Sequence, residues 1–390
     1  MKRTGDQAFI KELNKSIVLN LLRFQSPISR TQISVQTGLN KATVSSIVEE
    51  LIQEDLVLEV GRGHTRVGRR PVLLLFNARA GYVIGVDLGV DYVRVLATDL
   101  AGEIAGAREF RLTDNRTPQH VVESIVRGVH ELKAELPRSP HGIIGVGVGV
   151  PGLVDFSHGI VLNAPNLAWR DVHLGALLEN YLSLPVYVDN EANTGALGEK
   201  LFGVGKEASN LIYISVGTGI GTGIIVNNEL VRGSQGIAGE FGHMTIEAQG
   251  LKCSCGNHGC LEMYASERAL VQKYRHLTGL TLPTEDILAR LQTGDADALQ
   301  AIQTVGQYLG IGVANLAGGL NPSLILIGNR LASAGEWLLR PIEQTVQNRC
   351  FTMPYTQLRI QASSLGRNAC AVGAASLVLH EYFAGPQAAA

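Results

Sequence analysis

Two segments far apart in this chain share one pattern, a strand followed by a glycine turn and a second strand. The first is Tyr82–Leu96 (YVIGVDLGVDYVRVL), and the second is Leu211–Ile225 (LIYISVGTGIGTGII). A further turn follows each pair of strands within a few residues, at Asp99–Gly102 and at Asn227–Glu229. Such runs of β-branched residues around glycine predict hairpins. Because the pattern occurs twice, we expect a duplicated α/β fold.

The composition agrees with glycine turns that surround a ligand. The 390 residues include 45 glycines, well above the average of about 7%, whereas aromatic residues make up only 5%. The duplicated pattern resembles the actin/hexokinase-like (ribonuclease H-like) fold of sugar kinases. In that fold the backbone N–H groups of the two turns hold the phosphates of ATP.

The charge of the chain is unevenly distributed. Residues 1–80 carry 12 lysines and arginines against 7 acidic residues, a net charge of +5, and the remainder carries 21 against 28, a net charge of −7. A basic segment attached to an acidic body indicates a nucleic-acid-binding module joined to a domain that binds something else.

Signals for secretion or membrane insertion are absent from the sequence. Lys2 and Arg3 are followed by polar residues, whereas a signal peptide needs an apolar stretch there. The most apolar run, Ile143–Val154, is interrupted by glycine and proline and is too short to span a bilayer. Five cysteines, three of them between positions 253 and 260, do not fit a secreted disulfide framework. We therefore expect a cytoplasmic protein with a metal site.

Residues 1–79 predict a helix-turn-helix. A periodic apolar pattern over Ile10–Phe24 indicates a first helix, which Ser26-Pro27 ends. Ser29 caps a second helix that ends at Gly38, and Asn40 caps a third. The buried stripe of the third helix consists of Val44, Ile47, Val48 and Leu51. Two short helices joined by a tight turn have the spacing of a helix-turn-helix, and an ordinary three-helix bundle is the alternative.

Small polar and cationic residues at the start of the third helix suit contact with base edges in a major groove. Two predicted strands, Leu56–Val60 and Val72–Phe76, flank a loop that contains Arg62, Arg66, Arg69 and Arg70. A basic hairpin tip of this kind predicts a wing that follows phosphates or enters a narrow minor groove, and a solvated loop is the alternative. The predicted DNA-binding residues are Arg30, Thr31, Asn40, Lys41, Ala42, Thr43, Ser45, Ser46, Arg69 and Arg70.

One imidazole and three thiolates predict a metal site. The candidate ligands are His243, Cys253, Cys255 and Cys260. This set is usual for tetrahedral structural Zn²⁺, and because it fills all four positions it leaves none for a catalytic water. Cys350 and Cys370 lie in apolar surroundings and are predicted to belong to the core.

Five motifs occur in the order found in the ROK family, which comprises repressors and sugar kinases. They are Val150–Asp155 (VPGLVD), Asn163–Leu167 (NAPNL), Asp189–Asn193 (DNEAN), Gly239–His243 (GEFGH) and Cys253–Cys260 (CSCGNHGC). The resemblance covers nearly the whole chain, and the basic N-terminal segment places it on the repressor side. Stretches similar to the xylose repressors of Gram-positive bacteria include Pro27–Arg30, Gly38–Lys41, Gly68–Pro71 and Ser363–Gly366.

The resemblance implies a sugar-binding site. The residues that match the sugar-binding positions of the family are Asn166, Asn190, Glu191, Glu240, His243 and Glu262. Carboxylates accept hydroxyl protons in bidentate fashion, and a buried polar site rejects analogues that lack the hydroxyl. Glu240 and His243 are three residues apart, so His243 can hold zinc through one ring nitrogen and face the sugar with the other.

Three departures from the kinase pattern of the family favour a repressor that is not an enzyme. Asp87–Asp91 places a second carboxylate beside the first glycine turn, where it would repel a polyphosphate. Glu191 stands where kinases have an aspartate base, and Ile327–Arg330 lacks two glycines of the turn near the adenine site. The second turn, Gly217–Gly223, is intact, which leaves weak nucleotide binding open. The alternative is a hexose kinase using ATP, with an added DNA-binding segment.

We therefore predict three domains. Residues 1–79 form a winged helix-turn-helix domain, residues 80–192 the first α/β half of a ROK domain, and residues 193–390 its second half with the zinc loop and the C-terminal helices. The expected partners are a palindromic double-stranded DNA operator of sugar-utilisation genes, a sugar inducer (xylose or a related aldose) and further copies of the chain, in a homodimer or a higher homo-oligomer. No membrane partner is expected.

Overall fold

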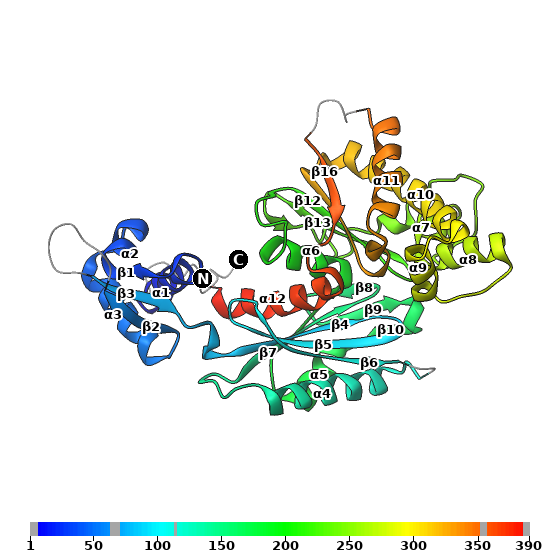
Figure 1. The fold of residues 1–390 in the computed structure, drawn as a ribbon. Helices are drawn as coiled ribbons and strands as arrows, with labels where there is room; N and C mark the ends of the chain where they lie inside the picture. The colour runs from blue at the N-terminus through cyan, green and yellow to red at the C-terminus, as the bar shows by residue number, and fades with distance from the viewer. Residues whose placement is uncertain (1–6, 63–70, 113–114, 352–356, 385–390) are drawn as a thin grey trace.

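The structure is a computed structural model, and it describes residues 7–62, 71–112, 115–351 and 357–384. An N-terminal domain lies at one end of the molecule, beside two α/β halves that each contain a central sheet (Figure 1).

The N-terminal domain contains the three predicted helices and a small sheet. Its helices are α1 (Gln7–Gln25), α2 (Arg30–Thr37) and α3 (Lys41–Gln53). Its strands, in the order β1-β3-β2, are β1 (Ile28–Ser29), β2 (Val57–Arg62) and β3 (Val72–Phe76). The fold agrees with the predicted helices and the two predicted strands, and β1 is an addition that the sequence analysis did not foresee.

Local capping explains where the helices of this domain begin and end. The Ser29 hydroxyl accepts a hydrogen bond from the Gln32 N–H, and the Gln32 side chain accepts one from the Ser29 N–H, which completes a capping box. Gly38 ends α2 at a φ of 73°, a conformation that favours glycine. The Asn40 carbonyl oxygen Oδ1 accepts a hydrogen bond from the Thr43 N–H at 2.9 Å and caps α3.

The two α/β halves contain five-stranded sheets of identical topology. In each sheet the first three strands along the chain form an antiparallel meander, and the fourth and fifth strands add in parallel beside the first. The first sheet consists of β4 (Tyr82–Leu88), β5 (Tyr92–Asp99), β6 (Ile104–Arg111), β7 (Ile143–Val150) and β11 (Val186–Asn190). The second consists of β12 (Leu211–Val216), β13 (Ile220–Val226), β14 (Glu229–Leu230), β15 (Leu324–Gly328) and β16 (Arg359–Ala362). The predicted duplication is therefore present in the fold.

Two helices lie between the sheets. Helix α6 (Glu191–Leu201) packs on β12 and β13, and α12 (Ala369–Phe383) packs on β4 and β7 of the first sheet as well as on α6 (Figure 1). The predicted border between residues 192 and 193 therefore falls inside α6, and α12 lies against the first sheet although the prediction assigned it to the second half.

The remaining elements are added to the two central sheets. The first half adds α4 (Pro118–Glu135), α5 (Leu174–Leu182) and a small sheet of β8 (Leu153–Asp155), β9 (Ile160–Ala164) and β10 (Trp169–Val172). The second half adds α7 (Glu262–Ala265), α8 (Glu267–Thr278), α9 (Thr284–Gln292), α10 (Ala296–Leu320) and α11 (Glu336–Arg349). Among the residues that the structure describes, no helix combines the length and the apolar character needed to cross a bilayer.

Candidate functional site

A cleft of about 130 Å³ lies between the two halves. The turn that joins β4 to β5 lines it with Gly89–Asp91, and the turn that joins β12 to β13 lines it with Gly217–Gly219. A single water needs only about 10–15 Å³, so the cleft has room for a small organic molecule. All six predicted sugar-binding residues line this cleft: Asn166, Asn190, Glu191, Glu240, His243 and Glu262.

Asn190 and Glu191 occupy the start of α6, where β11 ends. The Asn190 carbonyl oxygen Oδ1 accepts hydrogen bonds from the N–H groups of Ala192 and Asn193, and the Asn190 amide group donates one to the Gly152 carbonyl oxygen. Asn190 therefore caps the helix and has only an amide N–H left for a ligand. Glu191 follows it, and the Oε2 atom of its carboxyl group is buried without a hydrogen-bond partner among the described residues.

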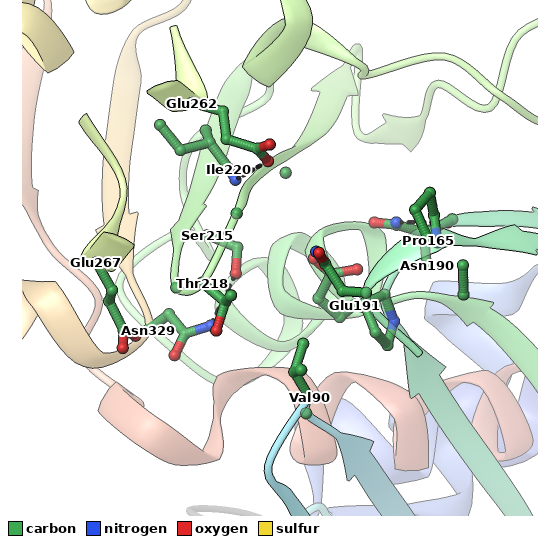
Figure 2. A pocket seen from close by; sticks show the side chains of 18 of the residues that line it. Val90, Pro165, Asn190, Glu191, Ser215, Thr218, Ile220, Glu262, Glu267 and Asn329 are labelled. Atoms are coloured by element: carbon green, nitrogen blue, oxygen red, sulfur yellow. Dashed lines mark hydrogen bonds between the residues drawn. The ribbon is translucent and has the colours of Figure 1, made fainter. Parts of the chain in front are cut away.

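Glu262 lies on a different wall of the cleft, at the start of α7 (Figure 2). Its Oε2 atom accepts a hydrogen bond from the Ile220 N–H at 3.3 Å, which holds this carboxylate beside the second glycine turn. Glu240 approaches from the loop after β14, and its carboxylate lies 3.9 Å from Nε2 of His243. Asn166 lies in the segment between β9 and β10.

The cleft is rich in carboxyl groups that burial makes hard to ionise. Burial raises the pKa of Glu191 to about 8, and the nearby carboxylate of Glu240 adds to this effect. Burial also raises the pKa of Glu267 to about 7 and raises the pKa of Asp87 and Glu240. Neutral carboxyl groups donate as well as accept hydrogen bonds. These walls therefore suit an uncharged molecule with many hydroxyl groups.

The four predicted metal ligands come together beside the cleft. The ligand atoms of His243, Cys253, Cys255 and Cys260 all lie within 4.8 Å of one another. Nδ1 of His243 lies 3.6 Å from Sγ of Cys253, and the Sγ atoms of Cys255 and Cys260 are 3.7 Å apart. Ligands at about 2.3 Å from a tetrahedral ion are separated by roughly 3.8 Å, so the residues fit a tetrahedral ion. His243 directs Nδ1 to the cluster and Nε2 towards Glu240.

Comparison with known proteins agrees with this arrangement. The model of the ROK family matches residues 83–381. The chain belongs to the ROK family. It is 41% identical over 378 residues to the xylose repressor of Bacillus subtilis, a match that covers 97% of this chain and 98% of the repressor.

Two solved ROK structures resemble the chain to different extents. A ROK family transcriptional regulator, homologous to the Mlc protein of Escherichia coli, matches with a TM-score of 0.81 and 30% identity over 96% of this chain and 97% of the regulator. A ROK family glucokinase from Streptomyces griseus, in complex with glucose and AMPPNP, matches with a TM-score of 0.71 and 33% identity. The glucokinase match covers 99% of the enzyme but only 76% of this chain. The ROK family therefore includes kinases, whereas the xylose repressor and the transcriptional regulator each match over nearly the whole chain.

Arg330 is a positive charge in the cleft that carboxylates already surround. Arg330 lines the cleft from the segment after β15, and its guanidinium lies 3.1 Å from the carboxylate of Glu267 and 2.9 Å from that of Glu285. It also lies 3.5 Å from the carboxylate of Asp91, across the cleft. Among the described residues that line the cleft, it is the one lysine or arginine, and its charge is already balanced by carboxylates.

The segment that carries Arg330 retains a backbone shape suited to glycine. Asn329 adopts a φ of 65°, and its side chain accepts a hydrogen bond from the Arg330 N–H. Its amide group donates to the Ser215 hydroxyl at 3.1 Å. Asn329 therefore holds a positive φ at a position where the sequence lacks the glycine expected there.

Eight of the ten predicted DNA-binding residues lie on α2 or α3 or directly before α3. Thr31, Asn40, Lys41, Ala42 and Ser46 are exposed, whereas Thr43 and Ser45 are half-buried. Arg30 forms an ion pair with Glu59 at 2.9 Å, so a DNA phosphate would compete with this carboxylate. Arg69 and Arg70 lie outside the described residues, as does the rest of the predicted wing tip at residues 63–70.

Several residues in or next to the cleft could not be predicted from the sequence. Glu267, which lines the cleft, and Glu285, which lies next to Arg330, gave no signal, because their role arises from a contact with Arg330 that only the tertiary fold creates. Arg330 and Asp91 were noted as departures from a kinase pattern, but nothing in their spacing indicates that they pair with each other. Tyr92 lines the cleft as well, and its hydroxyl donates a hydrogen bond to Asp87 at 2.8 Å.

Proposed function

We propose that this ROK protein is a sugar-responsive transcriptional repressor, whose N-terminal domain binds a palindromic operator and whose cleft binds the inducer. The observation that carries the proposal is the match with the xylose repressor over nearly the full length of both chains. That match includes the N-terminal domain, whereas the glucokinase match accounts only for the two α/β halves.

The chemistry of the cleft supports an uncharged aldose as the inducer, and we propose xylose or a related sugar. The cleft contributes six carboxyl groups, from Asp87, Asp91, Glu191, Glu240, Glu262 and Glu267. Carboxyl groups bind sugar hydroxyls, and those that are ionised repel phosphate groups at short range. We propose that the protein is not a kinase, because the one arginine of the described cleft is engaged by Glu267, Glu285 and Asp91.

We propose structural Zn²⁺ as the ion of the cysteine cluster, because one imidazole and three thiolates fit its preferred ligands and geometry. Zinc bound there would fix the tautomer and the orientation of His243, whose other nitrogen lies on the side of Glu240. We also propose a homodimer or higher homo-oligomer, because a palindromic operator is matched by two copies of the N-terminal domain related by two-fold symmetry. A repressor of this kind acts on DNA in the cytoplasm.

The test is operator release by sugars. A duplex that the protein itself selects from random DNA is labelled, and its dissociation is followed by fluorescence anisotropy against a panel of pentoses and hexoses. We expect an uncharged aldose to release the DNA, with pentoses more effective than hexoses. A protein that binds no selected duplex, or that keeps its DNA in the presence of every sugar, would contradict the proposal.

A further inference from the structure

Helix α12 extends from the cleft to the N-terminal domain. In Figure 1 it is the red helix that runs from the space between the two sheets towards the blue domain. Residues from the second half of α12, namely Ala375, Val378, Leu379 and Phe383, share one apolar core with Val18, Leu19, Leu22 and Phe76 of the N-terminal domain. One helix therefore belongs to both regions of the molecule.

The first turn of α12 is connected to a sugar-binding residue through α6. The Thr194 hydroxyl donates a hydrogen bond to the Glu191 carbonyl oxygen at 2.9 Å, and it lies 3.2 Å from Sγ of Cys370. Cys370 and Glu191 also line one small cavity next to the cleft. Thr194 therefore links the position of Glu191 to the start of α12.

Backbone contacts make this connection stiff. A Cβ atom on Gly373 of α12 would lie 1.6 Å from the Thr194 carbonyl oxygen, so the two helix backbones touch without a side chain between them. On the other side, a Cβ atom on Gly147 of β7 would lie 1.8 Å from the Ala374 carbonyl oxygen. Close-packed contacts of this kind transmit small shifts instead of absorbing them, because interiors have few voids and low compressibility.

The last residue of α12 is anchored on α1. The Phe383 carbonyl oxygen accepts hydrogen bonds from the Ser16 hydroxyl and from the Asn20 amide group, both at 3.1 Å. The Phe383 ring packs edge-on against Phe76, with ring centroids 5.9 Å apart, and the Arg23 guanidinium lies 4.5 Å from its centroid. The end of α12 is thus fixed to both α1 and β3.

We propose that α12 carries the sugar signal to the N-terminal domain, an inference that rests on the proposed function. Sugar that closes the cleft moves α6 with the second sheet, because α6 packs on β12 and β13. The movement passes through the Thr194–Gly373 contact to α12, and Phe383 then displaces α1. A small shift of this kind changes the position of α3 relative to the same helix of the second copy, which is sufficient to lose a fixed operator spacing.

The test removes the anchor without touching the cleft or the DNA surface. In the double variant Ser16→Ala/Asn20→Ala the Phe383 carbonyl oxygen loses both hydrogen bonds to α1. We expect operator affinity without sugar, and sugar affinity without operator, to stay within about threefold of wild type. The factor by which sugar weakens operator binding, typically about 5–150-fold in allosteric proteins, should fall towards one. By linkage, operator should also stop weakening sugar binding by the same factor.

Two further variants make the result decisive. Asn77→Ala removes an asparagine-to-carbonyl hydrogen bond inside the N-terminal domain, to the Asp55 carbonyl oxygen at 2.7 Å, and should keep the full sugar response. Phe383→Leu keeps an apolar side chain in the core but removes the ring that contacts Phe76 and Arg23, and should reduce the response. A full sugar response in both Ser16→Ala/Asn20→Ala and Phe383→Leu would overturn the role of α12. A wild-type protein that no sugar releases would instead reject the proposed function.

Discussion

The guanidinium of Arg330 lies 3.5 Å from the carboxylate of Asp91, so an ion pair connects the two halves across the cleft. Glu267 and Glu285 complete the surroundings of Arg330. A guanidinium with three carboxylate neighbours has little capacity left to bind phosphate, and Asp91 adds negative charge beside the first glycine turn. The same fold that holds AMPPNP in the Streptomyces griseus glucokinase therefore has in this chain a cleft suited to an uncharged ligand.

This ion-pair network leads to a prediction about catalysis. We expect no phosphorylation of xylose or glucose when ATP and Mg²⁺ are supplied, because Arg330 is already paired with three carboxylates and does not serve a polyphosphate. ADP release in a coupled assay measures this, with a glucokinase of the family as the positive control. Turnover near the usual kinase range of about 1–100 per second would show that the protein is an enzyme.

A second prediction concerns the basic loop. Arg69→Ala/Arg70→Ala should weaken operator binding and reduce the slope of log K against log salt concentration by roughly 0.9 for each phosphate that is no longer neutralised. Sugar affinity should be unchanged, because the cleft lies in the two α/β halves. The matched control is Arg108→Ala/Arg340→Ala, which removes two arginines from the surface of those halves. An unchanged affinity and slope in the wing variant would place Arg69 and Arg70 away from the DNA.

A third prediction follows from the buried carboxyl group of Glu191. Its pKa is about 8 in the folded protein, against an ordinary value of 4.5 for a glutamate in water. Between about pH 4.5 and 8 the folded state therefore holds a proton that the unfolded state releases. This proton makes the free energy of unfolding fall as the pH rises, by up to about 1.4 kcal/mol per pH unit for one group.

The variant Glu191→Gln tests that assignment, because an amide cannot titrate. Urea unfolding of the sugar-free protein from pH 5 to pH 8 should show a shallower loss of stability in the variant than in wild type. Glu267, whose raised pKa of about 7 acts in the same direction, still titrates in both proteins and contributes equally to both slopes. Parallel stability curves would show that Glu191 is ionised in the folded state at neutral pH.

The features that could be predicted from sequence are those that depend on neighbours along the chain. Ser29, Gly38 and Asn40 cap helices through hydrogen bonds within a few residues. The resemblance to the ROK motifs selected six residues, and all six line the same cleft. The apolar pattern of the first helix was less informative. Ile10 and Phe24 belong to it, yet their exposed fractions are 49% and 71%, while α1 buries Val18, Leu19 and Leu22. Helix α1 has apolar residues on two faces, and only the contact with α3, β3 and α12 decides which face is buried.

The ion pairs of Arg330 and the anchor at Phe383 could not be predicted for the same reason. Ser16 and Phe383 are 367 positions apart in the chain, and the hydrogen bond between them exists only because α12 ends against α1. Neither residue has a spacing or a composition around it that marks such a contact.

The last prediction tests whether the metal cluster and the sugar site act as one unit. Cys255→Ser removes one of the four ligands, and an incomplete set should lose zinc and release the loop that carries His243. Because Nε2 of His243 lies beside Glu240, and Cys253 lies 3.9 Å from the Glu262 carboxylate, disorder in this loop should reach both of these carboxylates, which are predicted to bind the sugar. We expect the variant to bind operator, since the apolar core of the N-terminal domain contains no residue of the zinc loop, but to keep its DNA when sugar is added.

The α/β halves of the Cys255→Ser variant should also melt at a lower temperature, because structural zinc contributes folding energy. Zinc content, melting temperature and sugar-dependent release are measured together, with Cys350→Ser, a buried cysteine outside the cluster, as the control. A zinc-free Cys255→Ser protein with a normal sugar response would restrict the cluster to a structural role and exclude His243 from sensing.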